Sequence, residues 1–561
     1  FAVDASNRKR NYYSGKDLIQ FSKTQGGIAT IATLKELYWQ SENYFNYNKE
    51  FNKNNRMNVM LGASWQQRVA ESVEATSQNF SDDFYQWHNL GAGTVTIPSK
   101  SEDYGWSINS YFARINYTLK DRYLFTATGR YDGSSKFGKN NKYAFFPSFA
   151  FAWRASEESF LKSVHWLNNL KVRTSIGETG NQEIGNYAFF QNLGSENAIF
   201  GDNYYTALYR STFGNPDLKW EKTLQWDAGV DVSVLNQRID LSLDYYYKKT
   251  VDLHYDKILP YYTGYSSQTQ NIGSKSNKGW EFSLNTQNLV GDFKWSTSLN
   301  IALNREKVLD LGDDEYFYTN GSGGALGAGF NETGIVKVGE PLGNFYGYVF
   351  DGIYQNEAEA KALGLTKDDV GSVKFKDLNG DNKITTEDRT IIGNANPDFI
   401  FGIGNDFSYK NFDLSFMFQG TYGNDVYNLL KVTFSELPSN SNNTGNAFAF
   451  VKDSWRGEGT SNTQQAFNKG VGPSSSRFVE DGSYIRLKNL TFGYTLPKSV
   501  TSKWGISNLR FYLSGQNLFT ITGYSGYDPE VSSRTGNYNL GFDGGSYPAT
   551  RSYTFGLNLT L

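Results

Sequence analysis

The stretch LQWDAGVDVSVLNQRIDLSLDYYY, residues 224–247, decides the fold class because its apolar and polar residues alternate with a period of two. One face of the first half carries Leu224, Trp226, Ala228, Val230, Val232 and Val234. One face of the second half carries Ile239, Leu241, Leu243, Tyr245 and Tyr247. Such strict alternation is typical of a half-buried β-strand. Only Asn236–Arg238 separates the two halves, so the sequence predicts an antiparallel hairpin of long strands.

The same alternation recurs along the chain and predicts about fifteen strands of roughly ten or more residues. A soluble β-sandwich also alternates, so the connections must distinguish the two architectures. Short links alternate with long polar links, and the long ones lie near residues 71–103, 177–219, 251–271, 309–397, 422–481 and 522–550. Short periplasmic turns and long extracellular loops are typical of outer-membrane barrels. The sequence therefore predicts an all-β fold, a large antiparallel transmembrane β-barrel.

The composition agrees with such a barrel and excludes several other classes of protein. Hydrophobic residues make up only 39% of the chain, and no stretch approaches the roughly 20 apolar residues of a spanning helix. The 56 Gly, 11 Pro and 16% aromatic residues suit many strands, tight turns and interfacial aromatic girdles. Lys and Arg number 54 against 57 Asp and Glu, so the basic footprint of a nucleic-acid-binding protein is missing. The chain has no Cys, which excludes disulfides, thiolate metal sites and a Cys nucleophile.

The 561 residues are interpreted as one unit, the C-terminal portion of a barrel. A soluble chain of this length suggests about three or four domains, but a closed sheet has no edges to limit its size. We expect the first strand near Thr33–Phe51, running inward like the last strand, which ends at Leu561. Single-chain bacterial barrels generally have an even number of strands. An odd count therefore predicts further strands, and a plug, upstream of Phe1.

Six segments resemble the SusC/RagA family of TonB-dependent transporters, and they span nearly the whole chain. In order, they are GRYDGSSKFG (129–138), SIGETGN (175–181), NPDLKWE (215–221), GSKSNKGWE (273–281), KDLNGD (376–381) and GQNLF (515–519). The resemblance implies a barrel of about 22 strands in the bacterial outer membrane, with an N-terminal plug in its lumen. It also implies energy coupling through a TonB box. Neither the plug nor a TonB box is found in this sequence, so contact with the TonB complex is expected through the missing N-terminal part.

The resemblance further implies a function and partners. Members of the family import mostly oligosaccharides, and in some cases oligopeptides. They act with a SusD-like surface lipoprotein that closes over the extracellular mouth, often as a dimer of transporter–lipoprotein pairs. Outer-membrane lipid is the remaining expected partner. The segment 309–397 is far longer than a connection requires, and we expect it to dock against the lipoprotein.

One local motif, DLNGDNKITTED at residues 377–388, has the spacing of a calcium-binding loop. Oxygen ligands at positions 1, 3, 5, 7, 9 and 12 suit Ca²⁺. Those positions hold Asp377, Asn379, Asp381, Lys383 through its backbone carbonyl, Thr385 and Asp388. Asn382 replaces the usual Gly at position 6, and the last ligand is Asp rather than Glu. The alternative is an Asx-rich turn that holds no metal.

Aromatic residues in the predicted loops are candidates for contact with substrate. Their apolar faces and hydroxyl groups match the mixed surface of a sugar. The candidates are Trp87, Tyr204, Tyr205, Tyr209, Tyr261, Tyr262, Tyr316 and Tyr318, with Tyr265, Tyr524 and Tyr527 as further loop tyrosines. The alternative for each is an interfacial girdle or ordinary loop packing.

Catalysis has little support, so the chain is not expected to be an enzyme. Its three His residues, His88, His165 and His254, lie in predicted connections without a nucleophile-elbow or zincin motif. Three functions remain. The first is active import, and the second is a barrel that serves as an adhesin, receptor or assembly scaffold. The third, a soluble all-β protein, requires the apolar faces to turn toward a core rather than toward lipid.

Overall fold

The computed structural model describes residues 1–201, 203–321, 328–435, 446–467, 469–530 and 538–561. Among these residues, sixteen strands form one main sheet in the order β1-β2-β3-β4-β5-β6-β7-β10-β11-β14-β15-β22-β23-β26-β27-β29. This sequential order is that of an up-and-down barrel wall. The residues group into two compact units: Phe1–Ala152, Ser175–Gln225 and Thr250–Ile272 in the first, and Trp153–Thr174, Trp226–Lys249 and Gly273–Leu561 in the second. The predicted all-β fold is confirmed.

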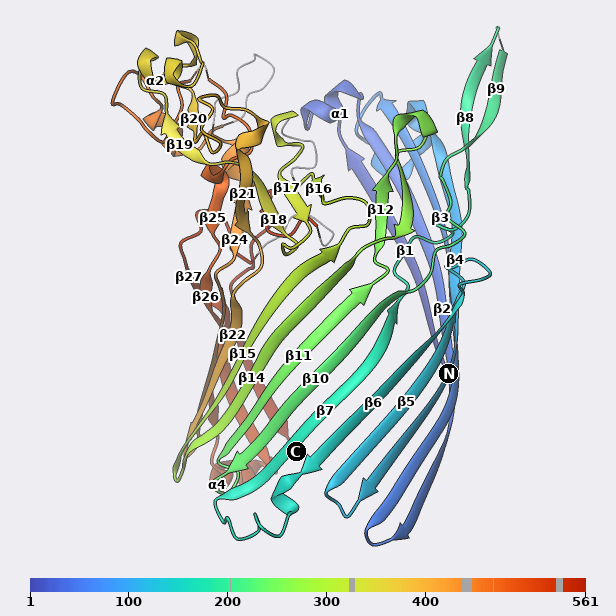
Figure 1. Cartoon of the computed structure of the whole chain (residues 1–561), viewed down its shortest axis with the longest axis vertical. Coiled ribbons are helices and arrows are strands. Elements are labelled where there is room, and N and C mark those ends of the chain that lie inside the picture. The colour runs from blue at the N-terminus through green and yellow to red at the C-terminus, as the bar shows by residue number, and fades with distance from the viewer. Residues whose placement is uncertain (202, 322–327, 436–445, 468, 531–537) are drawn as a thin grey trace. The chain divides into compact units, whose positions relative to one another are not determined.

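The first unit begins with five antiparallel strands that lie side by side (Figure 1). They are β1 (Ala2–Ser14), β2 (Ile28–Asn52), β3 (Asn55–Phe80), β4 (Gly93–Leu119) and β5 (Tyr123–Ser134), followed by β6 (Tyr143–Arg154). The strands β2, β3 and β4 contain 25, 26 and 27 residues, far beyond the common length of about five or six. The link between β4 and β5 is short and contains Lys120 and Asp121. Both residues have positive φ, which a tight turn requires.

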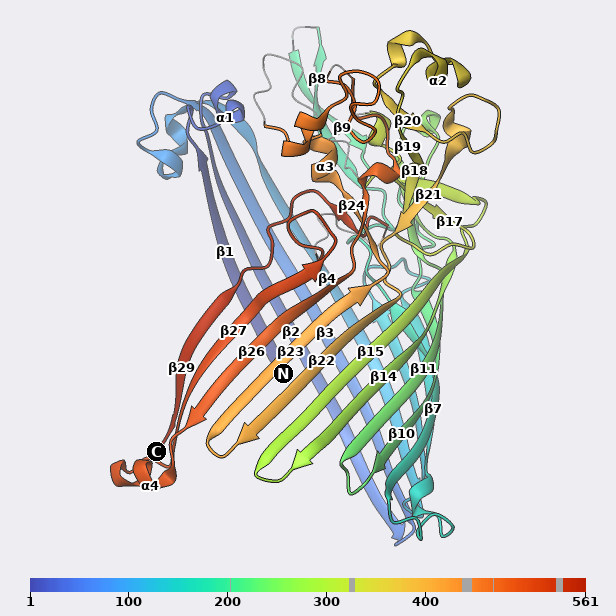
Figure 2. The ribbon, with the colours of Figure 1, turned by 90° about the vertical axis from the view of Figure 1, so that its left-hand side faces the viewer.

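The second unit contains a second run of antiparallel strands, and Figure 2 shows them with the small elements beyond their ends. They are β14 (Ser274–Val290), β15 (Phe293–Asp310), β22 (Phe399–Tyr409), β23 (Phe412–Tyr422), β26 (Tyr484–Thr495), β27 (Asn508–Thr522) and β29 (Ser552–Thr560). Each pairs with the next. The strands β7 (Leu167–Asn181), β10 (Glu221–Val234) and β11 (Ile239–Val251) complete the main sheet.

Most of the remaining elements lie in the long connections, whereas α1, η3, α4 and η10 lie in other links. The small strands are β8 (Leu193–Phe200), β9 (Asn203–Arg210), β12 (His254–Ile258), β13 (Ser267–Asn271), β16 (Tyr316–Thr319), β17 (Gly334–Lys337), β18 (Asn344–Tyr348), β19 (Phe350–Ile353), β20 (Val373–Phe375), β21 (Arg389–Asn394), β24 (Asp425–Asn428), β25 (Val479–Asp481) and β28 (Phe542–Asp543). The α-helices are α1 (Gln20–Thr24), α2 (Glu357–Ala362), α3 (Leu429–Thr433) and α4 (Lys498–Thr501). The 3₁₀ turns are η1 (Gln86–His88), η2 (Leu90–Ala92), η3 (Ala155–Glu157), η4 (Tyr261–Thr263), η5 (Ala328–Phe330), η6 (Lys367–Asp369), η7 (Thr386–Asp388), η8 (Ala449–Asp453), η9 (Ser476–Phe478) and η10 (Ser502–Trp504). Within the described part of the chain, no helix is both long and apolar enough to cross a membrane.

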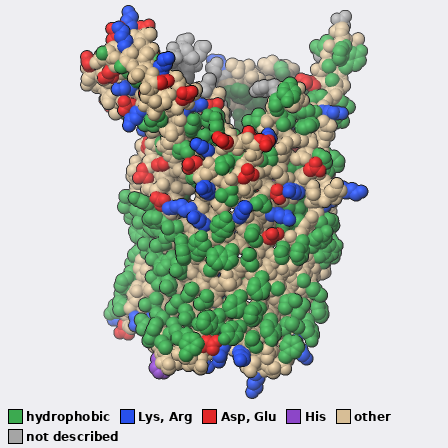
Figure 3. Space-filling model, viewed as in Figure 1, with side chains coloured by type: hydrophobic (Ala, Val, Ile, Leu, Met, Phe, Trp, Pro, Cys, Tyr) green, Lys and Arg blue, Asp and Glu red, His purple; other side chains and the backbone are tan. Residues whose placement is uncertain are grey.

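The two faces of the strands differ in chemistry, as the alternation predicts. In the second unit the apolar face carries Phe293, Trp295, Phe407, Phe412, Phe492, Tyr494, Leu513 and Phe555. Leu513 is 56% exposed and Phe555 is 72% exposed, so this face does not pack against a core. Several of its rings lie next to the short turns, where an interfacial girdle is expected. Figure 3 shows hydrophobic side chains over the strands and charged side chains gathered toward the end with the long connections.

The opposite face of the sheet is polar and hydrogen-bonded, as the neighbouring strands β7, β10 and β11 show. Arg173 donates to Asp231 at 3.1 Å and to Asp244 at 2.7 Å, and Ser242 donates to Asp231 at 2.8 Å. The carboxylates on this face are thus tied to neighbouring strands. An exposed apolar face and a polar inner face contradict the soluble alternative, because a soluble sheet turns its apolar face to the core.

The connections differ from the prediction in two respects. The loop expected over residues 71–103 is mostly strand, since β3 continues to Phe80 and β4 begins at Gly93. The loops expected over 177–219 and 251–271 each contain a hairpin, formed by β8 with β9 and by β12 with β13. The connection 309–397 also contains the short helix α2, and the link after β6 begins with the 3₁₀ turn η3. Much of the predicted loop sequence is therefore ordered structure.

The predicted strand count is also corrected. The strand β1 precedes the strand that was expected to be the first, and its thirteen residues pair with β2. Among the described residues the main sheet has sixteen strands, against about fifteen predicted, and the first of them, β1, runs opposite to β2. The argument from an odd count is therefore wrong. The presence of upstream strands and of a plug stays a prediction.

Candidate functional site

The connections of the second unit fold into a compact assembly beyond the strand ends (Figure 2). Its main core joins residues from three of the predicted long loops, 309–397, 422–481 and 522–550. The buried members are Phe330, Phe345, Tyr427, Leu429, Val432, Phe478 and Phe542. Phe345 and Tyr427 have no solvent exposure. Loops with a shared apolar core hold side chains in fixed places, which a binding surface requires.

Buried polar groups also tie these connections together. Glu480 accepts hydrogen bonds from the backbone N–H of Ser525 at 2.9 Å and from Lys431 at 3.2 Å. Burial alone raises the pKa of Glu480, but the hydrogen bonds from Ser525 and the charge of Lys431 outweigh burial and lower that pKa. Tyr524 donates to the fully buried Asp543 at 2.7 Å, and burial together with this hydrogen bond raises the pKa of Tyr524. The assembly is thus held by charge as well as by packing.

Arg486 of β26 connects the strand wall to the last long loop. Its guanidinium donates to Asp528 at 2.5 Å, to Glu530 at 2.6 Å and to the Thr520 hydroxyl at 2.8 Å. Arg486 is 2% exposed and Asp528 is 4% exposed. A buried charge is tolerated only when it is paired and hydrogen-bonded, and here all three donor nitrogens have partners.

The candidate ligand-contact surface lies on the small sheet β16-β17-β18-β21. Tyr316 and Tyr318, both predicted candidates, have ring centroids 5.3 Å apart, and Tyr318 lies 5.2 Å from Tyr346 of β18. The guanidinium of Arg389 lies 5.3 Å from the centroid of Tyr318 and 5.1 Å from that of Tyr346. Arg389 also donates to Glu332 at 2.6 Å. We call these residues, Tyr316, Tyr318, Tyr346 and Arg389, the tyrosine–arginine face.

The tyrosine–arginine face combines ring faces, hydroxyl groups and one cation. Tyr316, one of the residues of this face, is 46% exposed. Burial, followed by its hydrogen bond with Tyr346, raises the pKa of Tyr318, so the Tyr318 phenol stays protonated and able to donate at neutral pH. The tyrosine rings, positioned by the Arg389 cation, can stack on an extended polar chain. Their hydroxyl groups can hydrogen-bond to the same chain. The same chemistry suits a sugar ring or a peptide backbone.

The other predicted aromatic residues are not brought together in this way. Trp87 lies beside His88, with ring centroids 5.3 Å apart, and Tyr205 lies 6.0 Å from Phe200 across a hairpin. Tyr262 is 90% exposed. Tyr209 covers Gly194 of the neighbouring strand. The side chains of Tyr204 and Tyr261 lie outside the described residues.

The turn at residues 377–388 forms, and the carboxylates among its predicted ligands accept hydrogen bonds mainly from backbone N–H groups of the turn. Asp377 accepts from Gly380 at 2.6 Å and from Asn382 at 2.8 Å, while Asp381 accepts from Lys383 at 2.9 Å. Asn382 has a φ of 60°, the left-handed conformation that position 6 requires. Over the described residues, no group of three or more His, Cys, Asp or Glu side chains is arranged to hold a metal ion. The hydrogen bonds explain the turn without a metal, and calcium binding stays a prediction.

Replacing Asp388 by Asn is expected to weaken this turn by about 1 to 3 kcal/mol. Asp388 has no solvent exposure, and its carboxylate accepts from Leu378 and from Thr385, both at 2.8 Å. Burial raises the pKa of Asp388, but the donating amides outweigh it and lower that pKa. The carboxamide of Asn replaces one acceptor with a donor, which leaves one amide unpaired. Hydrogen exchange of the full-length protein should show faster exchange over residues 376–390.

The same measurement tests the calcium prediction. Protection of residues 376–390 that rises with CaCl₂ and falls with EDTA supports a bound ion. Equal exchange in the two buffers contradicts it. An Asp453→Asn variant, altered at a carboxylate outside the turn, is the matched control and should leave the exchange of residues 376–390 unchanged.

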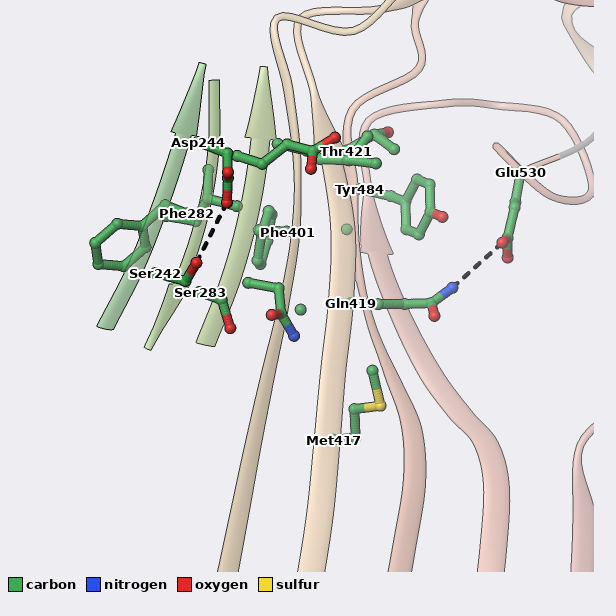
Figure 4. A pocket seen from close by; sticks show the side chains of 17 residues that line it. Ser242, Asp244, Phe282, Ser283, Phe401, Met417, Gln419, Thr421, Tyr484 and Glu530 are labelled. Carbon is green, nitrogen blue, oxygen red and sulfur yellow. Dashed lines mark hydrogen bonds between the residues drawn. The ribbon is translucent and has the colours of Figure 1, made fainter. Parts of the chain in front are cut away.

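The inner face of the second unit carries a groove of about 560 Å³ (Figure 4). Its lining comes from β11, β14, β15, β22, β23 and β26, together with Glu530 from the last long loop. Gln419 donates to Glu530 at 3.2 Å, and Ser242 donates to Asp244 at 3.2 Å. Glu530 also accepts a hydrogen bond from Arg486. The contact between the last long loop and β26 therefore lies at the edge of the groove. Polar side chains such as Asp244, Gln419 and Glu530 thus line part of this groove, beside apolar ones such as Ile400 and Met417.

Several of the residues that build the site were not found from the sequence. Tyr346, Arg389 and Arg486 lie in segments without a recognisable motif. The contacts of Arg389 and Arg486 join segments that are far apart in the sequence. A weak signal was present, because the YGY repeat at residues 346–348 alternates like a strand inside a predicted loop.

Comparisons with known proteins agree with this architecture. The family described as TonB dependent receptor-like, beta-barrel matches residues 2–518. TonB-dependent receptor P3 of Formosa agariphila is 41% identical over 95% of this chain and 53% of its own length. TonB-dependent receptor SusC of Bacteroides thetaiotaomicron is 36% identical over 80% of this chain and 43% of its own length.

A solved structure supports the same fold. The structure of the RagAB peptide transporter superposes with a TM-score of 0.83 at 23% identity, over 99% of this chain and 59% of that chain. At that identity the likeness concerns the fold alone. The chain spans about half the length of the curated relatives it matches.

Proposed function

The chain belongs to the TonB-dependent receptor-like β-barrel family and is an outer-membrane protein, and from this we propose that it serves active import of an oligosaccharide or oligopeptide. The whole protein would draw energy from TonB through residues outside this chain. The family consists of transporters rather than enzymes, and we propose no catalytic step.

The observation that carries the proposal is the folded loop assembly with its tyrosine–arginine face. An adhesin or scaffold needs an exposed surface, whereas an importer needs recognition groups held beyond the mouth of the barrel. The rings of Tyr318 and Tyr346 are fixed on Arg389, and their sheet rests on the buried core that includes Phe345. This rigid placement favours ligand recognition over the scaffold alternative.

A SusD-like surface lipoprotein is the proposed partner. The similarity to SusC supports this pairing, since 80% of this chain aligns with that receptor. The connection 309–397 supplies β16 to β21 and the turn at 377–388, and we propose that it docks against the lipoprotein. A dimer of such pairs is part of the same proposal.

Loss of one ring from the tyrosine–arginine face is expected to lower uptake about two- to tenfold, because each stacked ring contributes about 0.5 to 1.5 kcal/mol. The variants are Tyr318→Ala and Tyr346→Ala in the full-length protein. Uptake of labelled hexasaccharides and hexapeptides by whole cells, with and without TonB, is the measurement. Tyr262→Ala, which removes a predicted but isolated ring, is the control and should import normally.

Two results would contradict the proposal. If wild-type cells import neither ligand class in a TonB-dependent manner while the barrel is inserted, import is wrong and the adhesin or scaffold alternative stands. If uptake is TonB-dependent but equal in the Tyr318→Ala, Tyr346→Ala and Tyr262→Ala variants, the tyrosine–arginine face is not the contact surface.

A further inference from the structure

The loop assembly of the second unit contains a second cavity, separate from the tyrosine–arginine face. Its volume is about 250 Å³. Three segments that are distant in sequence form it: the end of β24 with α3, the start of η8, and the connection that follows β27. The lining residues are Asn428, Leu430, Lys431, Phe448, Ala449, Phe450, Ser525, Gly526 and Tyr527. We call this cavity the aromatic pocket.

Three aromatic rings, those of Phe448, Phe450 and Tyr527, form part of the wall of the aromatic pocket. Phe448 lies with its ring centroid 5.6 Å from that of Phe450, and it packs edge-on against Phe434 at 5.4 Å. Phe448 is 37% exposed and Tyr527 is 68% exposed, so both offer ring surface to solvent or to a ligand. Exposed rings around a concave surface are unusual on the solvent-exposed surface of a protein and are typical of binding sites.

Three polar residues of the pocket, Asn428, Lys431 and Ser525, already hydrogen-bond within the protein, and Tyr527 adds one further hydroxyl. Asn428 accepts from the backbone of Lys431 at 2.9 Å and donates to Glu480 at 3.3 Å. The Ser525 hydroxyl donates to the same carboxylate at 2.9 Å, and the Lys431 ammonium donates to it at 3.2 Å. The single positive charge in the lining is therefore neutralised by Glu480. The pocket offers apolar surface without a net charge.

We propose that the aromatic pocket holds one aromatic or large aliphatic side chain of an oligopeptide ligand. The inference rests on the proposed import function and narrows its ligand class. A volume of about 250 Å³ suits one large side chain rather than a whole ligand. Transfer of such a side chain from water to a position against the surrounding rings is favourable.

A sugar ring fits this pocket less well, although it has a similar size. Each buried hydroxyl of a sugar needs a hydrogen-bond partner, and a hydroxyl without one costs free energy. Asn428, Ser525 and Lys431 already serve Glu480 or the helix start, so they cannot satisfy several hydroxyls at once. An apolar side chain makes no such demand.

Purified full-length receptor and two labelled hexapeptides test the proposal. One peptide contains Gly and Ser with a single Phe, and the other has Ser in place of that Phe. A linear hexasaccharide of glucose is the third probe. Burial of a Phe ring should make the Phe peptide bind roughly ten- to hundredfold more tightly than the Ser peptide.

Three variants complete the design. Ala449→Trp fills the pocket, and Phe448→Ala combined with Tyr527→Ala removes two of its walls. Both are expected to abolish the advantage of the Phe peptide and to leave the Ser peptide unchanged. Tyr547→Ala, which removes an 86% exposed ring outside the pocket, is the matched control. Heat-modifiable migration of the barrel checks that each variant is folded.

Equal affinity of the wild-type receptor for the two peptides overturns the proposal, whether or not the variants fold. Three other results also overturn it: a Phe preference that survives in both variants, a loss of hexasaccharide binding instead, or a loss of lipoprotein co-purification with peptide binding intact. These results differ from failure of the import proposal itself, in which wild-type cells show no TonB-dependent uptake of any ligand.

Discussion

Replacing Arg486 by Ala is expected to lower the free energy of unfolding by about 3 to 5 kcal/mol and to release the last long loop from the wall. The substitution leaves Asp528, which is 4% exposed, as a buried carboxylate without its guanidinium partner. Burial raises the pKa of Asp528, while hydrogen bonds from the backbone of Glu530 and from Arg486 outweigh it and lower that pKa. Chemical denaturation of the full-length protein and limited proteolysis at residues 523–550 are the measurements.

Two controls separate charge burial from a general effect of substitution. Arg56→Ala removes a pair with Asp121 whose side chains are 49% and 48% exposed, and it should cost less than about 1 kcal/mol. The double variant Arg486→Met with Asp528→Leu removes both charges and should recover much of the lost stability. A single Arg486→Ala variant as stable as the wild type would show that the ion pair contributes little.

The same ion pair gives an expected dependence on pH. Because the pKa of Asp528 is lowered in the folded protein, the ion pair contributes fully to the free energy of unfolding at pH values above the ordinary pKa of Asp. The contribution is lost as the pH falls through the lowered value. Proteolysis of the loop should therefore increase in acid, and the increase should vanish in the double variant.

A charge on the apolar face has the second large expected effect. Leu513→Arg should destabilise the inserted barrel by about 2 to 4 kcal/mol near the centre of the bilayer. Leu513 lies in the middle of β27, opposite Phe492 on one neighbour and Phe555 on the other, and it is 56% exposed. The apolar face that carries Leu513 is assigned to lipid, in which a guanidinium loses its hydration. Unfolding in liposomes, followed by Trp fluorescence against denaturant, measures the loss.

The neighbouring residue Ser514 provides a matched control. It lies at the same depth but on the polar face, where its hydroxyl is 2.9 Å from that of Thr491. Ser514→Arg should change the free energy of unfolding by less than about 1 kcal/mol, since the new cation stays hydrated. Equal destabilisation by the two substitutions would mean that the assignment of the faces is wrong.

The strands with clear alternation were predictable because a period of two is visible in one segment alone. The hairpin of residues 224–247 appears as β10 and β11, with the turn where it was expected. The strand β1 was missed because its sequence, AVDASNRKRNYYS, is polar on both faces. Pairing with β2 satisfies its backbone, and backbone pairing leaves no pattern in the side chains.

The candidate site was predictable only where its members are neighbours in the sequence. Tyr316 and Tyr318 are two residues apart on one strand, so their rings share a face. Tyr346 and Arg389 join them through the sheet β16-β17-β18-β21, whose order depends on pairings between distant segments. The tie from Arg486 to Asp528 likewise spans 42 residues. Composition and local spacing carry no information about such contacts.

The length of β2, β3 and β4 has a consequence for the cell surface. A strand of 26 residues is about 85 Å long, and a tilt of about 45° leaves a rise of about 60 Å. The apolar band of an outer-membrane barrel is only about 25 Å tall. The tip at residues 81–92 therefore stands tens of ångströms above the lipid, within reach of antibodies and phage tail fibres. An epitope tag placed there should be detected on intact cells without permeabilisation.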